Sequence, residues 1–246
     1  MRVLILGGTG EATALAIQAR QLPQLEIITS LAGRTQTPLP IAGAVRVGGF
    51  GGPTGLADYL RIEQIDLLID ATHPFAAQIS WNAAQAADAA AIPYLMLVRP
   101  AWEPIASDAW IEVPTVAAAA AAIPPWTKRV FLTIGRQQLA PFSQLAHLWF
   151  LIRSIDPPTS EIPMPPGHLL LDRGPFNLEQ ERQLLRNYQI EAIVSKNSGG
   201  DATYAKVMAA RELSIPIVMI QRPAMPDAES VPDIESALAW LKQHSC

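Results

Sequence analysis

A short apolar strand, followed at once by a glycine-rich turn and a helix, opens the chain and constrains its fold most strongly. Val3 to Leu6 is a run of four apolar residues, which predicts a strand buried on both faces. Gly7-Gly8-Thr9-Gly10 follows, and the Ala- and Leu-rich segment from Glu11 to Arg20 predicts a helix. Glycines let backbone approach a phosphate closely, and a helix N-terminus presents aligned N–H groups to it. The arrangement is typical of nucleotide-binding α/β folds.

As a dinucleotide fingerprint the turn is incomplete. The segment from Gly8 to Thr13 contains G-x-G, but Thr13 stands where the third glycine of the fingerprint belongs. A tight strand-to-helix turn that binds no ligand is therefore the alternative interpretation.

Composition limits the class of protein. With 246 residues, half of them apolar, the chain is long enough for one large or two small domains. A net charge of −4 gives no sign of a nucleic-acid partner, and no uncharged apolar run is long enough to span a membrane. The sole cysteine, Cys246, leaves no disulfide framework or cysteine metal site, and we expect no metal. Because a strand begins within two residues of Met1, we expect no signal peptide and a cytoplasmic protein.

Strands and helices alternate along the whole chain, which predicts an α/β fold with mostly parallel sheets. The first hundred residues contain five predicted strands, at residues 3–6, 25–29, 44–47, 66–70 and 94–98. Residues 101–128 interrupt the alternation with three tryptophans and four prolines, which indicates a connection between two domains. A second α/β series then ends in a helix over residues 233–244. We therefore expect an N-terminal domain over residues 1–100 and a C-terminal domain over residues 129–246.

The end of the second predicted strand indicates which cofactor would bind. In dinucleotide-binding folds this position reaches the adenosine ribose, where an acid favours NAD and an arginine favours NADP. Here the strand ends in Ser30-Leu31-Ala32-Gly33-Arg34, which contains no acid. A hydroxyl and a guanidinium suit a 2′-phosphate, so we expect NADPH. A solvated surface arginine is the alternative.

Two further strand ends carry candidate ligand-binding residues. Gly48 to Gly52 holds four glycines in five positions, so its backbone can approach a flat ligand, although a flexible surface loop has the same composition. Thr72 and His73 follow the fourth strand, at the edge where open α/β sheets bind ligands. His73 can donate to a ligand or transfer a proton, or it can simply hydrogen-bond the turn.

Several predicted strands of the second half end in a basic residue. These residues are Arg136, Arg153, Arg173, Lys196 and Arg222. The carboxyl ends of parallel strands share one edge, so the cations would gather there and suit an anionic small molecule. Surface ion pairs are the alternative for any one of them. Residues 196–200, Lys-Asn-Ser-Gly-Gly before a helix, form a further candidate anion site.

Taken together, these strand-end motifs resemble the precorrin-6A reductases of cobalamin biosynthesis, including the cobalt-precorrin-6A reductases. The matching segments are residues 5–11, 30–34, 47–52, 70–76, 135–137, 173–176 and 196–200. The most specific are Thr72-His73-Pro74-Phe75-Ala76 and Lys196-Asn197-Ser198-Gly199-Gly200, which occur in one chain in this order.

The resemblance implies two Rossmann-like or flavodoxin-like domains, each with a mostly parallel sheet flanked by helices, and an active site in the cleft between them. It implies that NADPH reduces one C=C bond of the corrin precursor precorrin-6A, or of its cobalt complex, to give precorrin-6B. The substrate is then an anionic tetrapyrrole derivative, and a monomer or weak homo-oligomer is expected.

The resemblance also implies roles for individual residues. The residues expected to bind the cofactor are Gly7, Gly8, Thr9, Gly10, Glu11, Ser30, Ala32, Gly33, Arg34, Gly49, Phe50, Gly51, Thr72 and His73. Those expected to face the substrate are Arg136, Gln137, Arg173, Lys196, Asn197, Ser198 and Gly199. Lys196 and His73 are the candidate proton donors or polarising groups.

Two alternatives belong to other functional classes. One is a different NADPH-dependent small-molecule reductase. The other is a non-catalytic module in which two lobes bind an anionic ligand. The glycine turn favours a nucleotide, but a binding turn alone does not establish turnover.

Overall fold

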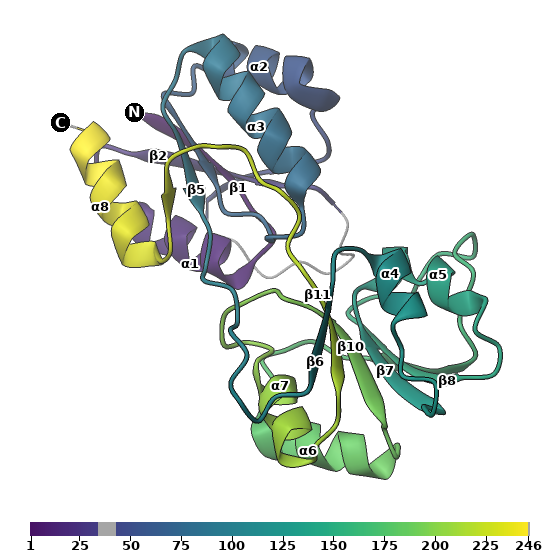
Figure 1. Cartoon of the computed structure of the whole chain (residues 1–246). Helices are drawn as coiled ribbons and strands as arrows, with labels where there is room; N and C mark the ends of the chain where they lie inside the picture. The colour runs from purple at the N-terminus through teal and green to yellow at the C-terminus, as the bar shows by residue number, and fades with distance from the viewer. Residues whose placement is uncertain (34–42, 246) are drawn as a thin grey trace. The chain divides into compact units, whose positions relative to one another are not determined.

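The computed structural model describes residues 1–33 and 43–245, so Arg34 lies outside the described residues (Figure 1). The chain folds into two compact units, each with its own core and sheet. The first unit joins Met1–Pro100 to Pro223–Cys246, and the second unit is Ala101–Arg222. Within the described residues, no helix is both long and apolar enough to cross a membrane.

The first unit is built on a six-stranded parallel sheet. Its strands are β1 (Arg2–Leu6), β2 (Glu26–Leu31), β3 (Ala44–Val47), β4 (Leu67–Asp70), β5 (Tyr94–Leu97) and β12 (Ser230–Val231). They lie in the order β12-β5-β4-β1-β2-β3, so the direction of the strand order reverses between β1 and β4. Ligands of open α/β sheets bind at the carboxyl ends of the strands beside such a reversal.

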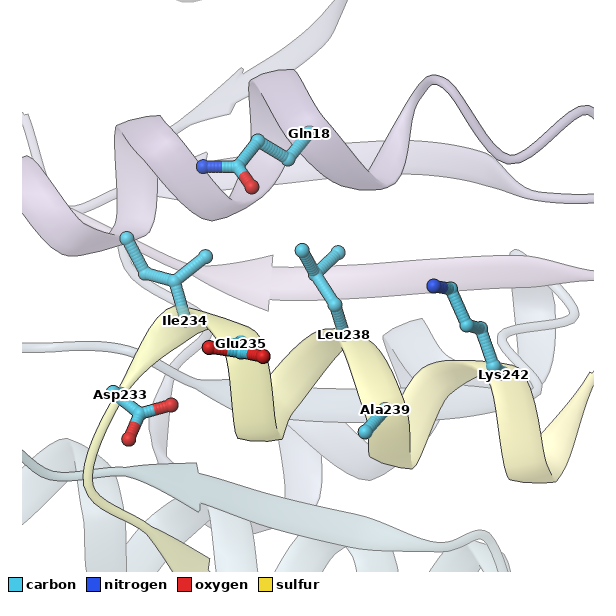
Figure 2. A pocket seen from close by; sticks show the side chains of 7 residues that line it. All are labelled: Gln18, Asp233, Ile234, Glu235, Leu238, Ala239 and Lys242. Carbon is cyan, nitrogen blue, oxygen red and sulfur yellow. The ribbon is translucent and has the colours of Figure 1, made fainter.

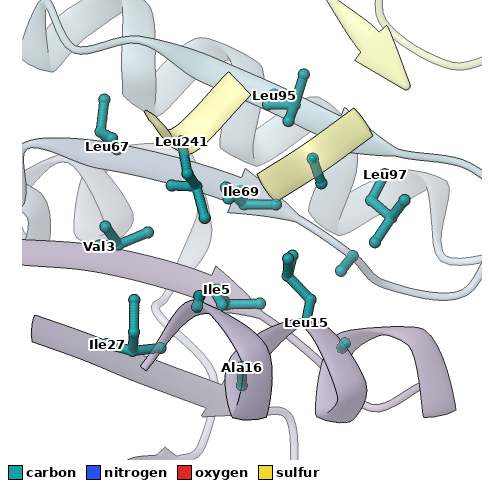
Figure 3. Close-up of a cluster of buried hydrophobic side chains, with 14 of the residues drawn as sticks. Val3, Ile5, Leu15, Ala16, Ile27, Leu67, Ile69, Leu95, Leu97 and Leu241 are labelled. Carbon is teal, nitrogen blue, oxygen red and sulfur yellow. The ribbon is translucent and has the colours of Figure 1, made fainter. Parts of the chain in front are cut away.

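Helices cover both faces of this sheet, which explains why β1 is apolar throughout. Val3 and Ile5 contribute to the core beneath α1 (Gly10–Ala19) and α8 (Ile234–His244), shown in Figure 3. Leu4 and Leu6 contribute to the core on the opposite face. That face is covered by α2 (Gly52–Ile62) and α3 (Ala77–Ala90). The predicted strand over residues 3–6 and its burial on both faces are therefore confirmed.

The second unit contains another six-stranded parallel sheet, in the order β6-β11-β10-β7-β8-β9. Its strands are β6 (Trp110–Val113), β7 (Arg129–Thr133), β8 (Trp149–Ser154), β9 (Gly167–Leu171), β10 (Ala192–Lys196) and β11 (Ile217–Ile220). Its helices are α4 (Val116–Ala121), α5 (Ala140–Ser143), α6 (Leu178–Asn187) and α7 (Ala205–Glu212), with a 3-10 turn η1 (Arg136–Gln138). Helices α6 and α7 bury Leu185 and Val207 in the core of this unit. The prediction of two α/β domains with parallel sheets is confirmed.

The structure divides the chain differently from the boundaries expected from sequence. Residues 101–128 form no separate connection, because β6 lies beside β11 in the second sheet and α4 follows β6. The closing helix α8 belongs to the first unit rather than to a C-terminal domain. There β12 pairs with β5, and Trp240 and Leu241 pack into the core that contains Leu95. The apolar face of α8 is thus buried by the first sheet.

This placement of α8 predicts a local effect of Leu241→Ala. Leu241 is fully buried, so removing its side chain should lower the free energy of unfolding of the first unit by about 2–5 kcal/mol. Hydrogen exchange should then accelerate in the amides of β1, β4 and β5. The exposed neighbour on the same helix, Gln243→Ala, serves as the control and should change neither quantity. Faster exchange confined to β10 and β11 would contradict the assignment of α8.

Candidate functional site

The turn between β1 and α1 leaves open space beside the first turn of the helix. Thr9 caps α1, since its Oγ1 accepts from the Ala12 amide at 3.0 Å and donates to the Ala71 carbonyl at 2.7 Å. Gly8 has a φ of 113°, and a Cβ at Gly8 or Gly10 would meet no atom of the described residues within 4 Å. Gly7 differs, because a Cβ there would lie 3.2 Å from the methyl group of Thr29. The turn therefore presents unhindered backbone at a helix N-terminus, which suits a phosphate.

A buried carboxylate fixes the segment that follows β4. Asp70 accepts from the amide and the hydroxyl of Thr72 at 2.9 and 2.6 Å, and from the hydroxyl of Tyr94 at 3.3 Å. Burial, together with the Asp70 carboxylate, raises the pKa of Tyr94 well above its ordinary range, so the phenol stays a donor. Thr72 is thereby held at the carboxyl end of the sheet, beside the Ala71 carbonyl that Thr9 contacts.

The geometry of His73 defines which ring nitrogen carries the proton. Its Nδ1 accepts from the Phe75 amide at 3.2 Å, and the two rings lie 5.9 Å apart between centroids. A neutral imidazole that accepts at Nδ1 carries its proton on Nε2. His73 is therefore arranged to donate a hydrogen bond from Nε2. His73 can therefore hydrogen-bond the turn through Nδ1 and donate to a ligand through Nε2, so the two expected roles are compatible.

A small pocket lies where the strand order reverses. It is lined by Thr9, Glu11, Ala71, Thr72, Pro74, Leu97 and Arg99. Arg99 pairs with Glu11 at 2.8 Å on one side of it. Three residues predicted for cofactor binding, Thr9, Glu11 and Thr72, are thus brought together beside Arg99.

A wider groove on the same unit contains none of the predicted site residues (Figure 2). It is lined by Gln18 of α1 and by Asp233, Ile234, Glu235, Leu238, Ala239 and Lys242. These side chains belong to helix surfaces and to the cap of α8, so the groove is separate from the glycine turn.

The ends of β2 and β3 place an arginine beside Ser30. Arg46 donates to the carbonyls of Gly48 and Gly49 at 2.6 and 2.7 Å, and one of its nitrogens lies 3.5 Å from the Ser30 hydroxyl. Its guanidinium lies 3.7 Å from the centroid of the Phe50 ring. Sequence analysis missed Arg46, because a single arginine in a four-residue strand carries no pattern.

The loop after β10, predicted to contact substrate, is held by side chains from elsewhere in the second unit. Asn197 accepts from the Trp102 amide at 2.8 Å and donates to the Trp102 carbonyl at 2.9 Å. The Trp102 indole donates to the Gly200 carbonyl at 2.8 Å. Arg222 donates to the carbonyls of Asn197 and Ser198 at 3.0 and 3.1 Å. The side chain of Asn197 thus supports the loop, and Trp102 is a supporting residue that sequence analysis did not identify.

Burial changes the chemistry of Lys196, the last residue of β10. Desolvation lowers the pKa of its ammonium to about 8, because the charged form loses hydration. Lys196 can therefore gain and lose a proton near neutral pH, which is a property of catalytic lysines.

The basic strand ends of the second sheet are not equivalent. Arg153 points into the core, where it pairs with buried Glu181 and lies 3.6 Å from the centroid of Phe176. Arg136 lies 4.0 Å from Asp156 and donates to the Pro157 carbonyl. Arg153 therefore forms an ion pair, but a buried one rather than the surface ion pair expected as the alternative.

A further cation, Lys206, is buried near Arg153. Its ammonium lies 4.7 Å from the Trp102 ring centroid and donates to the Thr203 carbonyl at 3.1 Å. Burial, and then the charge of Arg153, lower the pKa of Lys206 to about 7. Within residues 1–33 and 43–245, no group of three or more His, Cys, Asp or Glu side chains is placed to hold a metal.

Known proteins match this chain over almost its whole length. Residues 2–242 match the family described as precorrin-6x reductase CbiJ/CobK. A precorrin-6A reductase from Rhodococcus erythropolis is 50% identical over 242 residues, which cover 98% of this chain and 97% of that protein. A cobalt-precorrin-6A reductase from Priestia megaterium is 29% identical, with 90% of each chain covered.

A solved structure supports the fold in the same way. The structure described as CobK precorrin-6A reductase is 42% identical, with a TM-score of 0.93, and the match covers 99% of this chain and 97% of that one. The chain therefore belongs to the precorrin-6x reductase family and is an oxidoreductase.

Proposed function

We propose that this chain is a precorrin-6A reductase of cobalamin biosynthesis that uses NADPH to reduce one C=C bond of the corrin precursor, giving precorrin-6B. The observation that carries the proposal is the open β1–α1 turn of a chain that belongs, over residues 2–242, to this family. The metal-free substrate is favoured over its cobalt complex, because the precorrin-6A reductase is 50% identical and the cobalt-precorrin-6A reductase 29%.

The residues of the first unit fit a nicotinamide dinucleotide. Gly8 and Gly10 leave space for a pyrophosphate at the N-terminus of α1, and Thr9 joins this turn to the segment after β4. Glu11 and Thr72 line the adjacent pocket. When bound, NADPH supplies the hydride.

Residues of the second unit supply the remaining chemistry. A hydride added to one ring carbon must be matched by a proton at its neighbour. Lys196 fits the donor of that proton, because its pKa of about 8 keeps it protonated at neutral pH yet able to release the proton. The precorrin substrate is anionic, and Arg136, Arg173 and the loop after β10 supply basic side chains and N–H groups at strand ends. A cytoplasmic location and a monomeric or weakly associating state stay predictions.

The direct test is anaerobic incubation with precorrin-6A and NADPH, following NADPH absorbance and the macrocycle spectrum together. Loss of NADPH coupled to a change in the macrocycle spectrum is expected, with slower turnover of the cobalt complex. Binding of NADPH without reduction of either substrate would contradict the proposed chemistry and favour the non-catalytic module.

Gly10→Ala should separate cofactor binding from folding. The new methyl group would project into space that no atom of residues 1–33 or 43–245 occupies, so the Kd for NADPH should rise about tenfold or more. The free energy of unfolding should stay the same or increase by about 1 kcal/mol, because alanine favours the first turn of α1. The exposed Gln18→Ala on the same helix is the control and should leave the Kd unchanged. Equal cofactor affinity in Gly10→Ala and the parent would rule out this turn as the pyrophosphate site.

The pH dependence of kcat should identify the role of Lys196. A donor must carry its proton, so kcat should fall as the pH rises through about 8, the pKa of this buried lysine. Lys196→Arg keeps the charge but does not titrate in this range, so it should lower kcat and abolish the decrease near pH 8. The exposed Lys128→Arg is the matched control and should retain the parental profile. A decrease near pH 8 that persists in Lys196→Arg would assign the titration to another group.

A further inference from the structure

We infer that Arg46 binds the 2′-phosphate of NADPH and makes the enzyme prefer NADPH to NADH. The inference rests on the proposed function, since it names the residue that would recognise one group of that cofactor. Position, geometry and charge each support it.

The position of Arg46 follows from strand register. Leu6 of β1 is paired with Ser30 of β2, and Ser30 is paired with Arg46 of β3, so the three residues form one row across the sheet. The Gly7 amide also donates to the Ser30 carbonyl at 2.9 Å. In parallel sheets, paired residues of neighbouring strands project to the same face. Arg46 therefore stands one strand beyond Ser30, at the end of the sheet where a dinucleotide presents its 2′-oxygen.

The guanidinium is already oriented toward Ser30. Its contacts with the Gly48 and Gly49 carbonyls and with the face of Phe50 fix its plane, and one nitrogen lies 3.5 Å from the Ser30 hydroxyl. An arginine has five N–H donors, and these contacts leave some of them for an anion. A donor group held in place before binding loses little entropy when the ligand arrives.

Charge separates Arg46 from the neighbouring arginines of its unit. Arg2, Arg61 and Arg99 each pair with a carboxylate. In the part of the chain that the structure describes, Arg46 contacts neutral oxygens and the rings of Phe50 and Tyr59 and forms no ion pair, so its positive charge is not neutralised. An arginine of this kind attracts a dianionic phosphate, and residues 30–33 contain no acid that would repel one.

The space in front of Arg46 can admit a ligand. Among the residues that the structure describes, none has an atom within 4 Å of a Cβ built at Gly48 or Gly49, whose carbonyls hold the guanidinium. The alternative explanation is that Arg46 only holds the Gly48–Gly49 backbone against the end of β3 and binds no ligand. The two explanations differ in one respect, because a structural tie would affect NADPH and NADH alike.

The test compares Kd values for NADPH, NADH, 2′,5′-ADP and 5′-AMP in the full chain and in Arg46→Met. Methionine keeps an unbranched side chain against Phe50 but removes the charge. We expect NADPH and 2′,5′-ADP to bind about 10- to 100-fold more weakly, and NADH and 5′-AMP to change less than about twofold. Arg46→Lys should restore part of the preference. Arg61→Met, with the same change in net charge on α2, is the control and should keep the parental preference.

The outcomes separate this inference from the proposed function. Equal weakening of all four ligands in Arg46→Met, or no change in any of them, would overturn the role of Arg46 while precorrin-6A reduction by the parent still supports the function. A parent that shows no preference for NADPH over NADH would overturn the inference as well. A parent that binds neither cofactor and does not reduce precorrin-6A would overturn both.

Discussion

The parallel pairing of β1 between β2 and β4 is the constraint on which the candidate cofactor site depends. It brings the ends of three strands to one edge, and three hydrogen bonds then join them. The Gly7 amide donates to Ser30, the Ala71 amide donates to Leu6, and the Thr9 hydroxyl donates to Ala71. Two of these bonds join backbone groups only, and the third needs the Thr9 hydroxyl, so the geometry of the edge depends little on side chains other than Thr9. Side chains then fix the conformation of single segments at this edge, as Asp70 does when it accepts a hydrogen bond from the Thr72 amide.

The second unit uses the same sheet architecture but stabilises its loops differently. Trp102 and Asn197 exchange hydrogen bonds across 95 residues of sequence, and Arg222 binds two carbonyls of the same loop. In the same unit the buried Glu181 pairs with Arg153, and both charges act on the pKa of buried Lys206. Such a cluster of buried charges is costly unless every partner is present, so it favours one packing arrangement of the loops over others.

Features that adjacent residues determine can be predicted from the sequence. Features that depend on residues far apart in the sequence cannot be predicted in this way. The β1 strand and the glycine turn after it are set by adjacent residues, and they were predicted correctly. The prediction that α8 belongs to a C-terminal domain was wrong. An amphipathic pattern shows that one face of a helix is buried, but it does not show which sheet buries that face. The strand β6 was not predicted, because four residues inside a tryptophan- and proline-rich segment give no clear period. Arg46 and Trp102 were missed since their partners are determined by strand register and by contacts distant in sequence. Arg34 lies outside the described residues, so its expected role stays a prediction.

The return of the chain to its first sheet has a consequence during synthesis. Residues 101–222 are complete, with all six strands of their sheet, before β12 and α8 have been translated. At that stage the face of the first sheet around Val3, Ile69 and Leu95 still lacks Trp240 and Leu241 (Figure 3). The first unit is therefore completed after the second unit, although its sheet begins earlier in the chain. Until α8 emerges, a nascent chain exposes an apolar sheet face that a chaperone can protect and that another nascent chain can occupy by mistake.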